Sequence, residues 1–185
     1  YCGGISLACD PCSEAYETLL EREHKRLVVM LDPNVRTTFI EDADRYRSRI
    51  MKMMSLADIV KVSDEDLEWI INNSSSTEQK VKSILGIGAG LVILTRGSLG
   101  ATAYLKDGIA VHVLAEKADI IDTVGAGDTF NAGFLSKLSE LDFLQKESLT
   151  KISANAVEQA LQFGAKVAGV TVSRAGANPP WAAEL

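Results

Sequence analysis

Short apolar runs alternate along the chain with segments of helical periodicity, and this alternation constrains the fold more than any other feature. Residues 27–31 and 91–94 are continuous apolar runs, and residues 59–62 form a further short strand-like segment. Continuous apolar runs of this length are typical of strands that are buried on both faces of a parallel sheet. The chain is therefore predicted to be an α/β protein with a mainly parallel sheet layered between helices.

The segments between these runs carry the periodicity of helices and the turn residues of a hairpin. Helices are predicted at 13–25 (with Ser13 as cap), about 41–55, 64–71, about 77–85, 125–141 and 146–168. A hairpin is predicted at 101–105 and 109–114, and residues 171–173 are predicted to close the sheet. No repeat, linker or internal boundary is evident, so residues 1–185 are predicted to form one α/β domain.

Composition excludes several classes of protein. The net charge is −6 and no Lys/Arg-rich run occurs, which argues against nucleic acid as a partner. No apolar run approaches the roughly 18 residues of a membrane span, and no secretory signal is visible. Cys9 and Cys12 have the spacing of a metal or redox pair, but no second pair follows, so the three cysteines are interpreted as unpaired thiols of a cytoplasmic protein. Because the chain begins at Tyr1, we expect that upstream sequence is missing.

The segment Asp122-Thr123-Val124-Gly125-Ala126-Gly127-Asp128-Thr129-Phe130-Asn131 carries the clearest chemical signal. Its glycines allow the backbone amides to approach a ligand, and the residues after them have helical spacing. The first amides of a helix and its dipole favour an anion. Asp128 falls in the first turn, where the dipole favours the carboxylate form. The alternative is that Asp128 only caps a helix.

Polar residues also follow three of the predicted strands. These strand ends are Asp32-Pro33-Asn34, Ser63-Asp64 and Thr95-Arg96-Gly97. In open parallel sheets, ligands collect outside the carboxyl ends of the strands. The sequence therefore predicts a binding site at this edge of the sheet.

The whole chain resembles the C-terminal part of PfkB (ribokinase-like) carbohydrate kinases. The segment 122–133 is similar to the second signature of that family throughout. Asp32-Pro33-Asn34-Val35-Arg36 resembles a segment of fructokinases and 2-keto-3-deoxygluconate kinases. Thr95-Arg96-Gly97-Ser98-Leu99-Gly100-Ala101 resembles a nucleotide-phosphate loop, and residues 172–180 resemble the C-terminal stretch of the family.

The resemblance implies a role for each matching residue. Asp128 is the catalytic base that takes a proton from a sugar hydroxyl, and Gly125, Ala126 and Gly127 form the anion hole. The implied ATP-binding residues are Ser63, Thr95, Gly97, Ser98, Gly100, Gly127 and, in the adenine pocket near 163–165, Ala165. Asn34 and Arg36 are implied substrate residues.

Asp66 is implied to hold Mg²⁺ through water, although Ser63 and Asp66 depart from the family's Asn-x-x-Glu. Solvated acids at a helix start are the alternative. The implied K⁺ positions, mostly backbone carbonyls, are Asp122, Val124, Thr171, Arg174 and Gly176.

Several functions stay open at this point. An ATP-dependent fructokinase is favoured, with a 2-keto-3-deoxygluconate kinase as the first alternative and a non-catalytic sugar- or nucleotide-binding regulator as the second. A dinucleotide-binding oxidoreductase is disfavoured because residues 86–90 precede a strand and lack the third glycine. The family's N-terminal half, with most sugar contacts and the lid through which a homodimer could form, is not among these residues. We therefore expect this polypeptide alone to phosphorylate sugar poorly.

Overall fold

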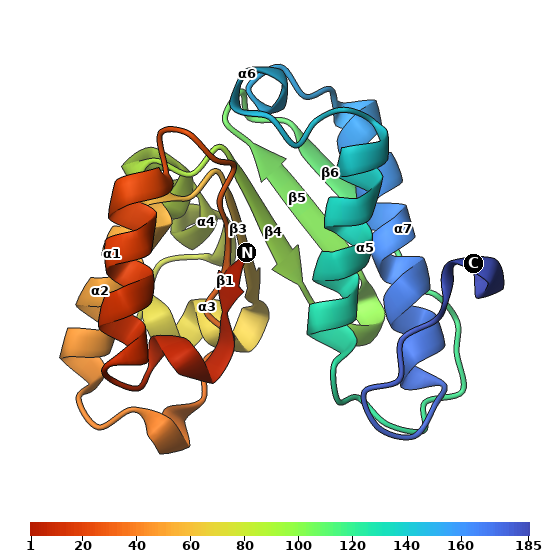
Figure 1. The fold of residues 1–185 in the computed structure, drawn as a ribbon, viewed down its shortest axis with the longest axis horizontal. Helices are drawn as coiled ribbons and strands as arrows, with labels where there is room; N and C mark the ends of the chain where they lie inside the picture. The colour runs from red at the N-terminus through yellow and green to blue at the C-terminus, as the bar shows by residue number, and fades with distance from the viewer. The chain divides into compact units, whose positions relative to one another are not determined.

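The computed structural model describes all 185 residues and has the predicted α/β architecture with a mainly parallel sheet (Figure 1). Its six strands are hydrogen-bonded in sequence order from β1 to β6. The strands are β1 (Cys2–Gly3), β2 (Met30–Asp32), β3 (Ile59–Ser63), β4 (Leu91–Thr95), β5 (Ala101–Leu105) and β6 (Ala110–Val113). The helices are α1 (Cys12–Glu23), α2 (Ala43–Leu56), α3 (Asp64–Ile70), α4 (Thr77–Ile87), α5 (Ala126–Glu140), α6 (Lys146–Leu149) and α7 (Ala154–Val172).

The chain divides into two compact units. The first contains Tyr1–Thr95 and Tyr104–Ile109, and the second contains Arg96–Ala103 and Ala110–Leu185. The prediction of one domain over residues 1–185 stays a prediction, and the two units are described separately below. No helix in either unit combines the length and the apolar character that crossing a bilayer requires.

In the first unit, β1 to β4 pair in parallel, which confirms the predicted mainly parallel sheet and adds a strand at Cys2–Gly3 that was not predicted. Ile59 lies opposite Met30 on one side and Leu91 on the other, and Ser63 lies opposite Thr95. One sheet face carries Val60, Val62, Val92 and Leu94 into a core with the apolar residues of α1 to α4. Ile59 and Ile93, which point to the opposite face, are also fully buried. The sequence reads as near-continuous apolar runs because both faces are covered.

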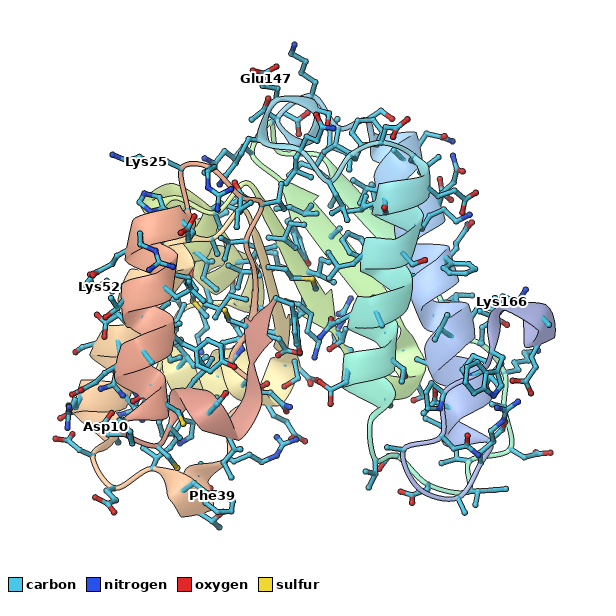
Figure 2. All side chains as sticks on the ribbon, viewed as in Figure 1. Asp10, Lys25, Phe39, Lys52, Glu147 and Lys166 are labelled. Atoms are coloured by element: carbon cyan, nitrogen blue, oxygen red, sulfur yellow. The ribbon has the colours of Figure 1, made fainter.

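Charged residues join α1 and α2, which lie side by side in Figure 1. Lys52, exposed on α2, bonds Glu17 of α1 at 2.7 Å (Figure 2). The buried Arg49 donates to Ser13 at 2.6 Å and to Asp10 at 3.1 Å. Ser13 therefore lies inside α1 as a hydrogen-bond partner of Arg49, and its predicted role as helix cap is wrong, because α1 begins one residue earlier behind Pro11.

In the second unit, α5 packs along α7, and α7 packs on β6. The contact depends on two small residues. A methyl group on Gly133 would lie 2.9 Å from a methyl carbon of Val167 and 3.0 Å from Cα of Gly164. The fully buried Phe134 and Leu138 complete the apolar face that the sequence predicts for α5.

Two predicted elements are wrong. Residues 171–173 do not close the sheet, because Thr171 and Val172 form the last turn of α7, where the Thr171 hydroxyl bonds the Val167 carbonyl at 3.0 Å. The predicted helix 146–168 is two helices, since Ser153 caps a new one by accepting the Ala156 amide at 3.2 Å. A β-branched run fits a strand as well as the last turn of a helix. A serine inside a helical pattern fits the interior of one helix as well as the cap of a second helix.

Candidate active site

The conformation of Gly125 determines how the chain enters α5. Gly125 has φ of 80°, in the left-handed region, and a methyl group there would lie 2.9 Å from Cβ of Ala177. Its carbonyl accepts the Thr129 amide at 2.9 Å and the Thr129 hydroxyl at 3.0 Å. The helix therefore starts abruptly, and its first turn contains Ala126, Gly127 and Asp128.

This first turn has the features of an anion site with an adjacent carboxylate. The first amides of a helix have no acceptor within the helix, and the positive end of its dipole lies there. The Ala126 amide bonds the Thr123 carbonyl at 3.2 Å, whereas Gly127 lies one residue further into the turn. The Asp128 side chain is exposed. Gly125, Gly127 and Asp128 thus lie at the start of α5, and the Ala126 amide is used by the Thr123 carbonyl. Their roles as anion hole and base stay predictions.

The Asp122 carboxylate connects the segments before α5 and after α7. One oxygen accepts the Val124 amide at 3.0 Å and the other accepts the Gly176 amide at 2.9 Å. These hydrogen bonds hold the pKa of Asp122 below its usual range, with the Val124 amide as the larger cause. Three of the residues predicted near a monovalent cation are therefore directly bonded to one another.

Two of the backbone carbonyls at the predicted cation positions already accept a hydrogen bond from an amide. The Thr171 carbonyl accepts the Arg174 amide at 3.1 Å, and the Gly176 carbonyl accepts the Asn178 amide at 2.8 Å. A carbonyl oxygen has two lone pairs, so each could still contact a cation. Arg174 bonds Glu184 through its guanidinium, which leaves its backbone as the group that a cation could use.

The segment after β4 forms a tight loop that closes on itself. Gly97 and Gly100 both have positive φ, 50° and 89°. A methyl group on Gly100 would lie 2.0 Å from the Val113 carbonyl, whereas one on Gly97 would meet nothing within 4 Å. Ser98 is exposed between them, and Thr95 ends β4 with its hydroxyl bonded to the Val62 carbonyl at 3.4 Å. The loop thus exposes backbone where the sequence predicts phosphate contacts.

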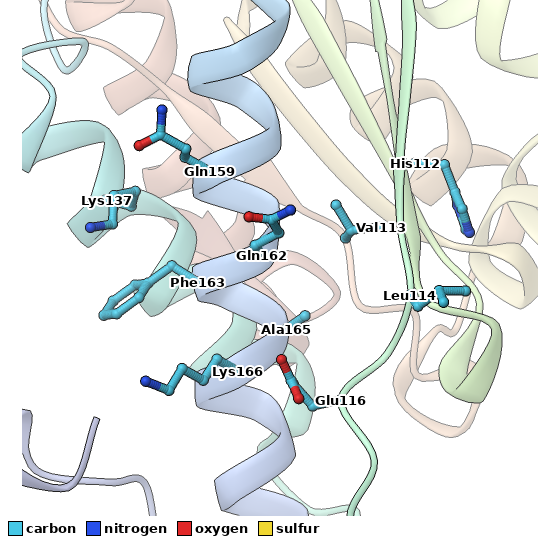
Figure 3. Close-up of a pocket in the computed structure, with 10 residues that line it drawn as sticks. All are labelled: His112, Val113, Leu114, Glu116, Lys137, Gln159, Gln162, Phe163, Ala165 and Lys166. Carbon is cyan, nitrogen blue, oxygen red and sulfur yellow. The ribbon is translucent and has the colours of Figure 1, made fainter.

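A pocket of about 610 Å³ lies in the second unit between the end of β6 and α7 (Figure 3). Val113 points toward α7 in this view, while His112 points to the opposite side of the strand. Ala165 and Phe163 belong to the lining, with Glu116, Lys137 and Lys166 as charged members. The pocket therefore includes the 163–165 segment where the resemblance implies an adenine site, and the small Ala165 leaves space in it.

In the first unit, the residues predicted at the strand ends converge around the segment after β2. Asn34 has φ of 43°, and its amide bonds a carboxylate oxygen of Asp32 at 3.2 Å. The Val35 amide bonds Asp66 at 3.1 Å. Arg36 is exposed at the end of this segment. The parallel register, which aligns Gly3 with Asp32 and Ser63 with Thr95, brings these ends to one edge of the sheet.

Asp66 is buried, with 8% exposure, and is not a solvated acid at a helix start. Burial raises its pKa, while the hydrogen bond from Ser63 opposes the shift. Ser63 caps α3 by accepting the Asp66 amide at 3.0 Å. Mg²⁺ in kinases takes one or two carboxylates together with phosphate oxygens. No group of three carboxylate, His or Cys side chains is available to a metal. Asp66 stays the predicted Mg²⁺ residue, and one of its oxygens already accepts the Val35 amide.

Lys61 is absent from the predicted site, although a lysine in a buried strand is a signal that could have revealed it. Its side chain is 6% exposed and its ammonium lies 3.0 Å from a carboxylate oxygen of Asp32, itself 1% exposed. A buried charge requires a partner, so Lys61 within the apolar sequence of β3 indicates a buried acid nearby.

The chain matches the pfkB family of carbohydrate kinases over residues 1–184. This chain belongs to the pfkB carbohydrate kinase family. It is 43% identical over 162 residues to a fructokinase of Rhizobium leguminosarum bv. trifolii, a match that covers 88% of this chain and 48% of that protein.

Solved pfkB-type structures share the ribokinase-like fold. A fructokinase with bound ATP from Xylella fastidiosa superimposes with a TM-score of 0.85 at 25% identity, covering 95% of this chain and 55% of that one. A Vibrio cholerae fructokinase variant in its fructose, ADP and potassium ion bound form has a TM-score of 0.80 at 24% identity, covering 95% and 54%. The chain spans about half the length of these pfkB relatives.

Proposed function

We propose that this chain supplies the nucleotide-binding and catalytic part of an ATP-dependent sugar kinase, with fructose, phosphorylated at the 6-hydroxyl, as the first candidate substrate. The observation that carries the proposal is the start of α5. There a left-handed glycine opens a helix whose first turn contains Gly127 and an exposed Asp128. This geometry, together with the pfkB relatives, supports phosphoryl transfer better than any other function considered.

The chemistry requires alignment and charge stabilisation more than a strong base. Phosphoryl transfer has a loose transition state, so removal of the alcohol proton can come late, and a carboxylate is an adequate base. In this proposal Asp128 accepts that proton. The first-turn amides of α5, Gly127 foremost, stabilise negative charge that develops on the transferred phosphoryl group. When bound, Mg²⁺ neutralises phosphate charge, and Asp66 is the residue that would hold it.

ATP is proposed to bind along the second unit. The loop at Gly97, Ser98 and Gly100 would contact the phosphates, with Gly97 and Ser98 as its exposed residues. The pocket beside Phe163 and Ala165 has a volume of about 610 Å³, in the range of small-molecule sites. A potassium-type ion is proposed at the position where Asp122 joins the segments around α5 and α7.

The test is a substrate screen combined with an Asp128→Asn variant of the full-length protein. ADP release should be measured with fructose, ribose, 2-keto-3-deoxygluconate and a nucleoside. The variant is expected to lose at least about 100-fold in kcat, the usual contribution of a positioned base, while ATP affinity measured by calorimetry stays within about threefold. Unchanged turnover by Asp128→Asn would exclude Asp128 as the base.

A 2-keto-3-deoxygluconate kinase is the second candidate because Arg36 is exposed after the Asp32-Pro33-Asn34 segment. An acid substrate requires a cation for its carboxylate, and a guanidinium can bind it with two hydrogen bonds. Under this alternative, Arg36→Ala raises KM for the keto acid far more than KM for fructose. Equal effects on both substrates would count against it.

A further inference from the structure

We propose that Lys61, Asp32 and Asp66 form a buried clamp that fixes the segment Pro33–Arg36, and that they act as positioning residues for Arg36 in the proposed phosphoryl transfer. The proposal rests on the proposed function for its catalytic consequence, but the clamp itself is defined by geometry within the first unit. None of its three side chains exceeds 8% exposure.

Two carboxylates hold consecutive amides of this segment. Asp32 accepts the Asn34 amide at 3.2 Å, and Asp66 accepts the Val35 amide at 3.1 Å. The Tyr46 hydroxyl, also buried, donates to the Pro33 carbonyl at 3.4 Å. Asn34 is thereby held in the left-handed region, which a non-glycine residue seldom adopts without support. Three consecutive residues are thus fixed from β2, α2 and α3.

The positive charge of Lys61 offsets the repulsion between the two buried carboxylates. Asp32 and Asp66 accept the amides of the adjacent residues Asn34 and Val35, so the two buried carboxylates face one short segment. Two buried carboxylates without a cation would repel each other and would be poorly solvated. The ammonium of Lys61, 3.0 Å from Asp32, therefore allows both acids to act as acceptors.

The consequence reaches Arg36 through the backbone. Arg36 directly follows the clamped Val35, and its guanidinium bonds the Val35 carbonyl at 3.0 Å. Loosening the Asn34 and Val35 amides would therefore release the one exposed cation of this segment. A displacement of about 1 Å in a group that aligns reactants can cost on the order of 100-fold in rate.

The experiment uses Lys61→Met in the full-length protein, with Lys80→Met as the matched control. Lys80 is also a buried lysine, with 1% side-chain exposure, and it pairs with Glu68 rather than with Asp32 or Asp66. Amide exchange of Asn34 and Val35 and the steady-state kinetics are measured for both. Lys61→Met is expected to accelerate exchange of these two amides at least about tenfold and to lower kcat about 10- to 100-fold, with KM for ATP within about threefold. Lys80→Met is expected to change neither the exchange of these amides nor kcat.

A second pair of variants covers the case in which Lys61→Met does not fold. Asp66→Asn keeps an oxygen that can accept the Val35 amide, whereas Asp66→Ala removes it. A positioning role predicts that the Val35 amide exchanges at the wild-type rate in Asp66→Asn and at least about tenfold faster in Asp66→Ala. Equal exchange of this amide in the two variants would overturn the clamp.

Failure of the clamp can be separated from failure of the proposed function. If the wild-type protein phosphorylates no sugar, the proposed function fails, and the exchange measurement still tests the clamp. Unchanged exchange of Asn34 and Val35 in both Lys61→Met and Asp66→Ala would then overturn it. If exchange accelerates while kcat of an active enzyme is unchanged, the positioning role is overturned.

Discussion

Replacing Gly133 by alanine separates helix propensity from packing, because the two effects have opposite signs at this position. Alanine in a helix interior is favoured over glycine by about 1 kcal/mol. The added methyl group, however, would lie 2.9 Å from a Val167 methyl carbon and 3.0 Å from Cα of Gly164. The side chain of Val167 can adjust, but the backbone of Gly164 cannot without moving α7. Overpacking of this kind costs about 1–3 kcal/mol, so we expect a net loss of about 1 kcal/mol in the free energy of unfolding.

The matched control is Gly86→Ala near the end of α4, where the new methyl group would meet nothing within 4 Å. This variant should be stabilised by up to about 1 kcal/mol. Urea unfolding followed by circular dichroism measures both changes. Because the two glycines lie in different units, amide exchange of α4 and of α5 assigns each change to its own unit. If Gly133→Ala is stabilised as much as Gly86→Ala, the close packing of α5 on α7 inferred here is wrong.

Two further predictions test the second unit. Gly100→Ala places a methyl group 2.0 Å from the Val113 carbonyl, and it should weaken ATP binding at least about tenfold in calorimetry (about 1.4 kcal/mol). Gly97→Ala, in open space, is the control, and similar losses in both variants would refute the steric argument. The second prediction concerns Asp122→Asn. In the wild type, the folded-state pKa of Asp122 lies below its ordinary value of 3.8. The carboxylate therefore stabilises the fold above pH 3.8, and this stabilisation is lost as the pH falls through the lower folded-state pKa. The difference in unfolding free energy between wild type and Asp122→Asn should therefore shrink below about pH 4, and a difference that stays constant down to the lowest pH measured would contradict the assignment.

Much of the fold follows from local patterns. The strands at 59–63 and 91–95 were predictable because parallel strands covered on both faces require continuous apolar sequence. The hairpin of β5 and β6 was predictable from its turn residues. The strand predicted at 27–31 differs from the observed β2. This strand covers only Met30–Asp32 and ends at the polar Asp32. Asp32 pairs with Gly3 of β1 across the sheet, and no local pattern contains that pairing.

At the start of α5, part of the candidate site could be predicted from the sequence and part could not. Glycines before a helical pattern indicate a helix N-terminus, and an acid three residues into it is visible in the sequence. The sequence does not show that the Ala126 amide turns back to the Thr123 carbonyl, or that the carboxylate of Asp122 bonds amides 2 and 54 residues away. Such contacts depend on chain segments that meet only after folding.

The sequence by itself therefore determined the α/β class, the pfkB resemblance and the position of Asp128 at a helix start, because each depends on residue type and spacing over a short stretch. Only the tertiary structure decided that Asp66 is buried rather than solvated, and that Lys61 shares its surroundings with Asp32. Burial and charge pairing are set by residues distant in sequence that the parallel register brings to one edge of the sheet. For that reason the residues proposed to contact ligand were visible in the sequence, and the residues proposed to hold them in place were not.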